Sequence, residues 1–292
     1  MDWAKVDHVE SKQLFIVKTQ DGLVYSGSLS TPETVGGRPI KIEILEPPDN
    51  RVEVDKMRII KMDETSGNLW QRFNGDIGMG VIYNKGNQST QYNLTSSVNY
   101  PRPRWAAGAS YNSTLSANTG TSPSTRNEIN VNAMRLLRWN NWYYTGLADF
   151  LQSSVQGIQL QTTFGGGVGR YLKNTNHAAI SVTGGFAWQR INYLKTIVPA
   201  ATQDVTSGLI GSQVKLFWFN KTTLDISTYL LPALSEPGRV HYSLNTSYYV
   251  KLWSNLTWNI SFYGNWDNRP PPGFTGSDYG TSSGVSWTFG NH

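Results

Sequence analysis

The chain contains no cysteine, which excludes structural disulfides, thiolate metal sites and cysteine nucleophiles. It also has no run of about 18 apolar residues. Its mean hydropathy is −0.40, and membrane-spanning helices are therefore excluded. A transmembrane β-barrel escapes both tests, because only every second residue of each strand faces lipid. No signal peptide is recognisable at the start of the sequence, and for an exported protein we expect this signal to lie upstream of Met1 or to have been removed.

Charged residues are scarce and unevenly distributed. They make up 15% of the chain, with a net charge of +5. Residues 1–66 carry 9 Lys and Arg against 12 Asp and Glu, whereas residues 67–292 carry 16 against 8. The positive excess of the second part favours anionic lipid head groups or anionic solutes as neighbours. Its basic residues are scattered rather than clustered, which argues against nucleic acid as a partner.

Aromatic residues, in contrast, are abundant, with 11 Trp and 15 Tyr. Amphipathic rings gather where apolar and aqueous phases meet, as in the girdles of a membrane barrel. A carbohydrate-binding β-protein would show the same excess, so composition alone leaves both classes open.

The segment from Asn255 to Trp266 shows the pattern that organises most of the chain. Its side chains alternate with a period of two, with one apolar set, Leu256, Trp258, Ile260, Phe262 and Trp266, and one polar set, Thr257, Asn259, Ser261, Tyr263 and Asn265. Similar segments recur for more than two hundred residues, with no helical pattern that would supply a second layer. We therefore expect lipid to cover the apolar faces.

From Trp70 onward the alternation predicts about twelve strands of roughly ten residues each. Short connections, at 101–104, 139–141, 173–177, 220–222 and 253–255, alternate with mostly longer ones, notably 115–126, 195–204 and 267–278. Short turns at one end and long loops at the other are typical of outer-membrane proteins. The sequence thus predicts an all-β fold, in which residues 67–292 form a transmembrane antiparallel up-and-down β-barrel. With an even strand count, both barrel termini lie on the short-turn, periplasmic side.

The pattern of residues 1–66 predicts that they form a small periplasmic β domain. Strands at 14–18 and 23–26 flank the hairpin signal Asp21-Gly22, and two more follow at 40–45 and 52–54. The spacing of Trp3–Val9 repeats that of Val54–Ile60, so the unit is expected to be truncated at its N-terminus. Such a unit suggests an SH3-like or Sm-like barrel. Its negative charge favours a protein contact over RNA.

Two sets of barrel side chains are candidates for function. The candidate lumen-lining residues are Asp76, Asp149, Lys215, Asp225, Tyr249, Lys251, Asn259 and Tyr263. The candidate lipid-facing or girdle aromatics are Tyr83, Trp105, Trp142, Trp188, Trp218, Trp258, Trp266, Trp287 and Phe289. Folding the chain about Asn220 places Lys215 opposite Asp225, where the charges stabilise the strand pair. Arg135 falls on the face of Ile129 and Val131, which requires either a bulge or a position near the head groups.

No catalytic residue, metal site or cofactor is predicted. Gly165–Gly169 mimics a phosphate-binding loop, but no helix pattern or Lys-Ser/Thr pair follows, so bent strands or lumen space explain the glycines better. His241 and Ser243 both point inward, whereas an outer-membrane lipase needs this pair to face lipid. No His/Glu spacing suits zinc and no acidic loop suits calcium.

Four segments, at 80–90, 165–172, 261–271 and 278–289, resemble those of the bacterial domain-of-unknown-function family 481. The resemblance spans essentially the whole chain. It implies an outer-membrane β-barrel of the salt-induced outer-membrane protein type, with no established activity and no catalytic residues. The chain departs from a common barrel ending, because Phe289 is followed by Gly290-Asn291-His292 rather than closing the sequence.

Three functions follow as hypotheses. The first is a structural or envelope-stress role in the outer membrane, with residues 1–66 contacting a periplasmic protein. The alternative is a narrow passive channel for small polar solutes, and a third is an outer-membrane hydrolase. The lumen charges favour a plug of salt bridges, and its Tyr and Asn residues favour a pore for sugar-like or nucleoside-like solutes. The expected partners are outer-membrane lipid and the barrel-assembly machinery.

Overall fold

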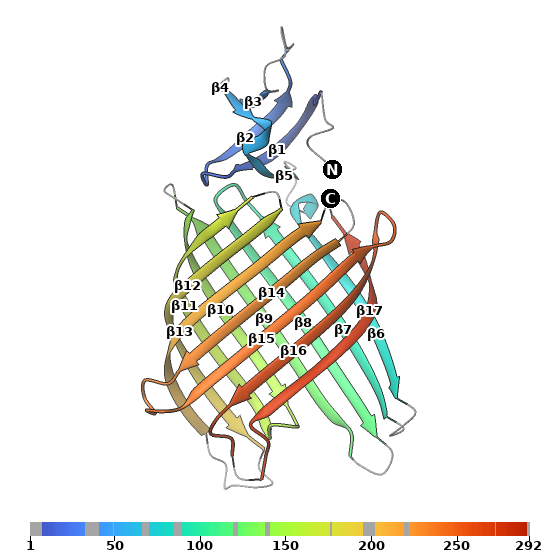
Figure 1. The fold of residues 1–292 in the computed structure, drawn as a ribbon, viewed down its shortest axis with the longest axis vertical. Helices are drawn as coiled ribbons and strands as arrows, with labels where there is room; N and C mark the ends of the chain where they lie inside the picture. Colours follow the sequence, from blue (N-terminus) through green and yellow to red (C-terminus); the bar gives the residue numbers. More distant parts are fainter. Residues whose placement is uncertain are drawn as a thin grey trace.

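The structure is a computed structural model that describes residues 8–32, 41–48, 50–65, 70–84, 89–118, 122–137, 141–175, 177–194, 202–218, 222–271 and 273–290. It contains a five-stranded sheet followed by a closed twelve-stranded antiparallel barrel (Figure 1). No helix among these residues is long and apolar enough to cross a membrane. The all-β, twelve-stranded prediction is confirmed.

The small sheet has the strand order β4-β3-β2-β1-β5. Its strands are β1 Ser11–Thr19, β2 Val24–Ser30, β3 Lys41–Glu46, β4 Asn50–Asp55 and β5 Ile59–Thr65. A 3-10 turn, η2 Lys56–Arg58, leads into β5, and Asp55 caps it by accepting a hydrogen bond from the Met57 amide. The core consists of Val17, Leu29, Ile42, Ile44, Val54 and Ile59. β5 is absent from the predicted strands, because Lys61, Asp63 and Glu64 interrupt its apolar alternation.

After a 3-10 turn, η3 Trp70–Arg72, twelve strands form the barrel. They are β6 Asn74–Asn84, β7 Ser89–Pro101, β8 Trp105–Asn118, β9 Ser124–Leu136, β10 Trp142–Ser153, β11 Ile158–Asn174, β12 Ala178–Tyr193, β13 Thr202–Trp218, β14 Thr222–Pro232, β15 Val240–Lys251, β16 Leu256–Asp267 and β17 Ser277–Phe289. Some strands are longer than predicted, and β11 and β13 have 17 residues each. The predicted extents of the loops at 115–126 and 195–204 are therefore wrong, because β8 continues to Asn118 and β13 already begins at Thr202.

The two ends of the barrel differ in their connections. The turns after β7, β9, β11, β13 and β15 are at the end that also carries both barrel termini and the small sheet (Figure 1). We call this the short-turn end, and the opposite one the loop end. The small sheet contacts the short-turn end through a hydrogen bond of 2.9 Å from Asn141 Nδ2 to the Gln20 carbonyl oxygen.

The pairing registers are regular at the two positions that the sequence singled out. Lys215 pairs with Asp225, as predicted, and their side chains form an ion pair of 2.8 Å. Arg135 pairs with Tyr144 on one side and Trp105 on the other without any shift of register. A bulge at Arg135 is therefore wrong, and the residue lies next to the last residue of β9, at the short-turn end.

Closure joins the last strand, β17, to the first, β6. This seam has six paired positions, from Gly284 opposite Gly80 to Phe289 opposite Gly75. Every other pair of neighbouring barrel strands among the described residues has nine or more. Glycines on both sides bring the backbones close together, and a Cβ at Gly284 would lie 2.4 Å from the Met79 carbonyl oxygen.

Candidate functional site: the barrel lumen

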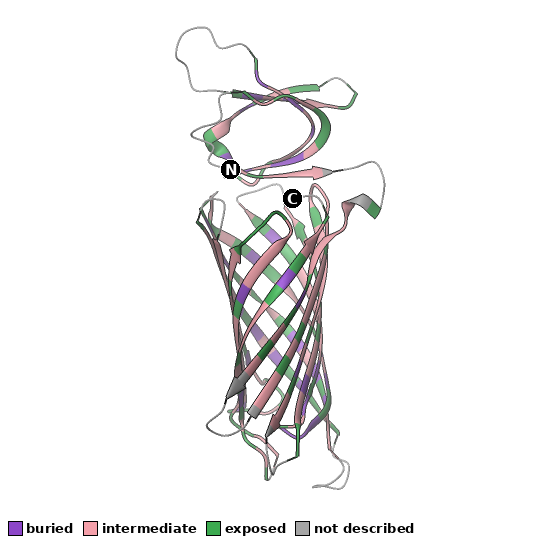
Figure 2. Cartoon of the chain, turned by 90° about the vertical axis from the view of Figure 1, so that its right-hand side faces the viewer, coloured by how far each residue is buried: buried purple, intermediate pink, exposed green. Residues whose placement is uncertain are grey.

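The outer and inner faces of the barrel differ in chemistry. Exposed and less exposed residues alternate along its strands (Figure 2). The outward side chains are apolar and exposed even near the middle of strands, for example Met79 at 67%, Phe186 at 69% and Ile210 at 58%. The inward face carries Asn, Gln, Ser, Thr and Tyr with a few charged groups. This polarity is the reverse of a water-soluble barrel and matches one surrounded by lipid.

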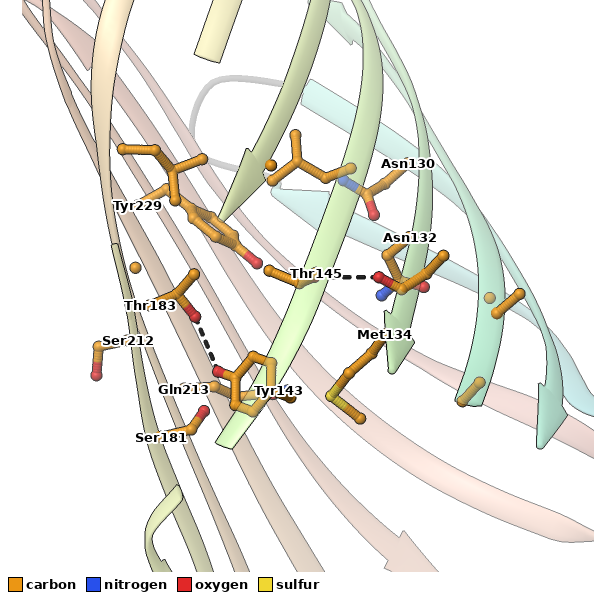
Figure 3. A pocket seen from close by; sticks show the side chains of 18 of the residues that line it. Asn130, Asn132, Met134, Tyr143, Thr145, Ser181, Thr183, Ser212, Gln213 and Tyr229 are labelled. Atoms are coloured by element: carbon orange, nitrogen blue, oxygen red, sulfur yellow. Dashed lines mark hydrogen bonds between the residues drawn. The ribbon is translucent and has the colours of Figure 1, made fainter. Parts of the chain in front are cut away.

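Two larger cavities lie in the lumen among the described residues. The first has a volume of about 190 Å³ and lies toward the short-turn end, where Asn130, Tyr143, Thr183 and Gln213 point into it (Figure 3). Tyr143 Oη lies 2.8 Å from Thr183 Oγ1 across this space. The second, central cavity has a volume of about 350 Å³. Two smaller pockets, of about 70 Å³ and 10 Å³, lie toward the loop end.

A buried polar cluster occupies the lumen near the loop end. Asp278 Oδ2 accepts hydrogen bonds from Arg126 Nη1 at 3.1 Å and from Ser153 Oγ at 2.8 Å. Arg126 also pairs with Glu128 at 2.9 Å, and its guanidinium lies 4.6 Å from the ring centre of Tyr263. The Arg126 and Asp278 side chains are only 6% and 5% exposed.

This cluster bridges opposite walls of the barrel. Ser153 lies on β10 and Asp278 on β17, and these strands are five positions apart in a ring of twelve. Arg126 on β9 and Tyr263 on β16 are also five positions apart. These contacts therefore place side chains from distant strands together inside the lumen. We call Arg126, Glu128, Ser153, Tyr263 and Asp278 the cross-lumen cluster.

A second cluster surrounds Arg239, which precedes β15 at the loop end. Its side chain is 3% exposed and pairs with Asp267 at 2.7 Å and with Glu236 at 3.1 Å. Its Nη2 also donates to the Tyr193 hydroxyl at 3.3 Å. These contacts extend from β12 to β16 and hold the 233–239 loop against the inner wall.

The long 268–276 loop adds to this closure. Phe274 packs against Gly157, so closely that a Cβ at Gly157 would lie 2.6 Å from its ring. Gly157 follows β10 and Phe274 follows β16, six positions away around the ring. The loop therefore reaches from one wall of the barrel to the opposite wall.

The structure places most of the candidate lumen residues on the inner face. Asp76, Asp225, Tyr249, Asn259 and Tyr263 line the central cavity, and Asp149 lines the pocket of about 70 Å³. Lys215 joins them through its ion pair with Asp225. Lys251 is exposed at the end of β15 and lines none of these cavities.

The candidate aromatic residues fall at both ends of the outer face. Exposed fractions are 45% for Trp105, 36% for Trp142, 50% for Trp218, 45% for Trp266 and 59% for Trp287, and Trp188, Trp258 and Phe289 are half-buried. Most of these lie near the short-turn end, whereas Trp188 and Trp266 lie near the loop end. The side chain of Tyr83 lies outside the described residues.

Sequence reasoning missed the residues that close the lumen. The sequence pattern predicts Arg126 at the edge of the 115–126 loop and indicates no role for Glu128, Ser153, Asp278 or Arg239. The available signal was the inward phase of Arg126 and Glu128, which they share with Asn130 on β9. The contact between Arg126 and Asp278 is not readable from the sequence, because closure of the barrel brings together residues 152 positions apart.

The alternatives considered for chemistry find little support. Gly165–Gly169 lies inside β11, and the ring of Tyr143 occupies the space where a Cβ of Gly169 would be. His241 and Ser243 line the same small pocket, but no hydrogen bond joins them among the described contacts, and His241 is buried. The described residues contain no group of three or more His, Asp or Glu suited to a metal ion.

Known proteins resemble this chain only weakly in structure. The translocator domain of autotransporter NalP from Neisseria meningitidis is 13% identical, over 74% of this chain and 87% of that chain, with a TM-score of 0.41. The NanC porin is 11% identical, over 74% and 99%, with a TM-score of 0.45. The β domain of the Bordetella autotransporter BrkA is 9% identical, over 74% and 98%, with a TM-score of 0.36. No curated protein matches the chain.

A family model gives a clearer result. It matches residues 77–289, which run from within β6 to the end of β17 and so cover nearly the whole barrel. The family predicted from the sequence is thereby confirmed. The chain belongs to the family described as protein of unknown function, DUF481.

Proposed function

We propose that the protein is a bacterial outer-membrane barrel whose lumen is closed at the loop end and whose role is structural or related to envelope stress. The outward apolar side chains and the two sets of aromatic residues support a location in a lipid bilayer. The short-turn end, with the small sheet, would face the periplasm, as in other barrels with an even number of strands. No enzymatic activity is proposed.

The contacts between distant strands inside the barrel are the main support for a closed lumen. Asp278 on β17 holds Arg126 and Ser153 from the far wall, and Phe274, after β16, packs against Gly157, after β10. Burying these charges together costs desolvation, which only complete pairing offsets. Such a cluster stabilises a shut barrel but obstructs a permeation path.

The small sheet would contact a periplasmic partner protein. Its strand order and the η2 turn before β5 support the SH3-like interpretation. Among the described strands, β4 and β5 are the two edges of the sheet, to which a partner strand can add. An acidic unit of this kind is not suited to RNA.

Conductance of the refolded protein in a planar bilayer tests the closed lumen. We expect insertion without single-channel steps in 1 M KCl. Insertion should be verified separately, by protection of the barrel from protease in vesicles of the same lipid. Reproducible steps from inserted protein would overturn the closed lumen.

A narrow passive channel for small polar solutes is the second candidate, favoured by the cavities of about 350 Å³ and 190 Å³. The Lys215→Ala variant separates the two. In a shut barrel it should lower the free energy of unfolding by at most about 1 kcal/mol, since the pair with Asp225 is partly solvated. In an open barrel it should also shift the reversal potential toward cation selectivity, because Asp225 would remain in the lumen without its counter-charge.

A further inference from the structure

Two outward-facing arginines lie side by side with aromatic rings near the short-turn end. Trp105 of β8 pairs with Arg135 of β9, and Arg135 pairs with Tyr144 of β10. Trp142 of β10 pairs with Arg170 of β11. These five residues therefore form one continuous patch over four neighbouring strands, which we call the arginine patch.

The patch is exposed on the outer surface. Trp105, Trp142 and Tyr144 are 45%, 36% and 54% exposed. The Arg170 guanidinium lies 5.7 Å from the ring centre of Trp142, and Arg135 is exposed and forms no ion pair among the described residues. The turn before β8 adds two more arginines, since the Arg104 carbonyl accepts from the Leu136 amide at 2.7 Å and the Arg102 amide donates to Trp105 at 2.8 Å.

The acidic residues of the barrel near this end lie on its other face. In the short-turn half of the described strands the acidic residues are Asp76 and Asp225, and both line the lumen. The loop end also has an outward arginine beside a tryptophan. There the outward Arg190, 5.2 Å from the ring centre of Trp188, is paired with Asp204 at 2.8 Å.

The position of the patch restricts what it can bind. An arginine on the lipid face is costly at the bilayer midplane and nearly neutral at the interface. Trp and Tyr also prefer the head-group level. The guanidinium groups are therefore expected at the depth of the lipid phosphates, whose oxygens match their paired donors.

We propose that the arginine patch binds the phosphate of an anionic phospholipid head group in the leaflet at the short-turn end. This inference rests on the proposed location in a membrane. Phosphatidylglycerol-type lipids fit the patch, because they bring a negative charge and no cation of their own that would oppose Arg135 and Arg170. The neighbouring rings then flank the glycerol region of the bound lipid.

Native mass spectrometry of the full chain, released from bilayer nanodiscs of equal phosphatidylglycerol and phosphatidylcholine, tests this site. The wild type should retain phosphatidylglycerol preferentially. An arginine at an anionic surface contributes roughly fivefold in affinity. The Arg135→Gln/Arg170→Gln variant should therefore lose at least about fivefold of the preference. Arg170→Lys should retain most of it, because the charge remains.

Arg190→Gln is the matched control, since it also removes an exposed arginine beside a tryptophan, but at the loop end and outside the patch. It should leave the lipid ratio unchanged. An unchanged ratio in the double variant would overturn the lipid site, while insertion into the nanodisc would leave the membrane location standing. Failure of the wild type to enter a bilayer would overturn both. Displacement of phosphatidylglycerol by lipopolysaccharide in a competition arm would overturn the assignment to a phospholipid.

Discussion

The free energy of unfolding of an Arg126→Met variant should be about 3–5 kcal/mol lower than that of the wild type. The arginine is buried between Glu128 and Asp278, and its removal leaves two carboxylates in the lumen without a cation. Methionine retains much of the side-chain volume, so the loss reports charge rather than a cavity. Urea unfolding in lipid vesicles, followed by tryptophan fluorescence, measures it.

Arg190→Met is the control for this experiment. It breaks an ion pair of similar length, 2.8 Å, but its partners are 50% and 47% exposed. Solvent screens an exposed pair of this kind, so the loss of unfolding free energy should be several times smaller than for Arg126→Met. Equal losses in the two variants would show that the cross-lumen cluster is solvated, and the closed lumen would then be untenable.

In a Phe186→Arg variant the free energy of unfolding should fall by about 2–4 kcal/mol. Residue 186 lies near the middle of β12 on the outer face, so the new charge would lie at the centre of the bilayer. In a barrel surrounded by water the same change would cost little, since Phe186 is already 69% exposed. The size of the loss therefore separates lipid from water around the barrel. The measurement is again the unfolding free energy in vesicles.

Leu172→Arg provides the comparison at the membrane edge. Leu172 is 63% exposed and lies two residues before the end of β11, at the short-turn end. The cost there should be about 0–1 kcal/mol. If Phe186→Arg and Leu172→Arg lower the free energy of unfolding equally, depth in a bilayer does not determine the cost, and the barrel is not surrounded by lipid.

The sequence predicted the barrel well because its period-two alternation is a local property. The position of Lys215 opposite Asp225 follows from a single short turn between two strands, and the structure has this pair. β5 was missed because its charged residues break the alternation, although Ile59 enters the core of the small sheet. Its pairing with β1 depends on the folded sheet and not on the local pattern.

The lumen was harder to predict for a physical reason. An inward phase shows that Asp149 or Tyr263 lies on the inner wall, but not which side chains meet across it. That depends on strand tilt and closure, which place β9 and β10 opposite β16 and β17. The loops that cover the end, with Arg239 and Phe274, have no periodic pattern at all.

Because the ladder between β6 and β17 is short, the strength of strand pairing varies around the circumference of the barrel. With six paired positions between them, the first and last strands separate at a lower energetic cost than any other neighbours described. Amide hydrogens of this seam should exchange with deuterium ahead of those between β11 and β12, where fifteen positions pair. A lateral gate, if the wall ever parts to admit a lipid tail or an incoming strand, would form at this seam.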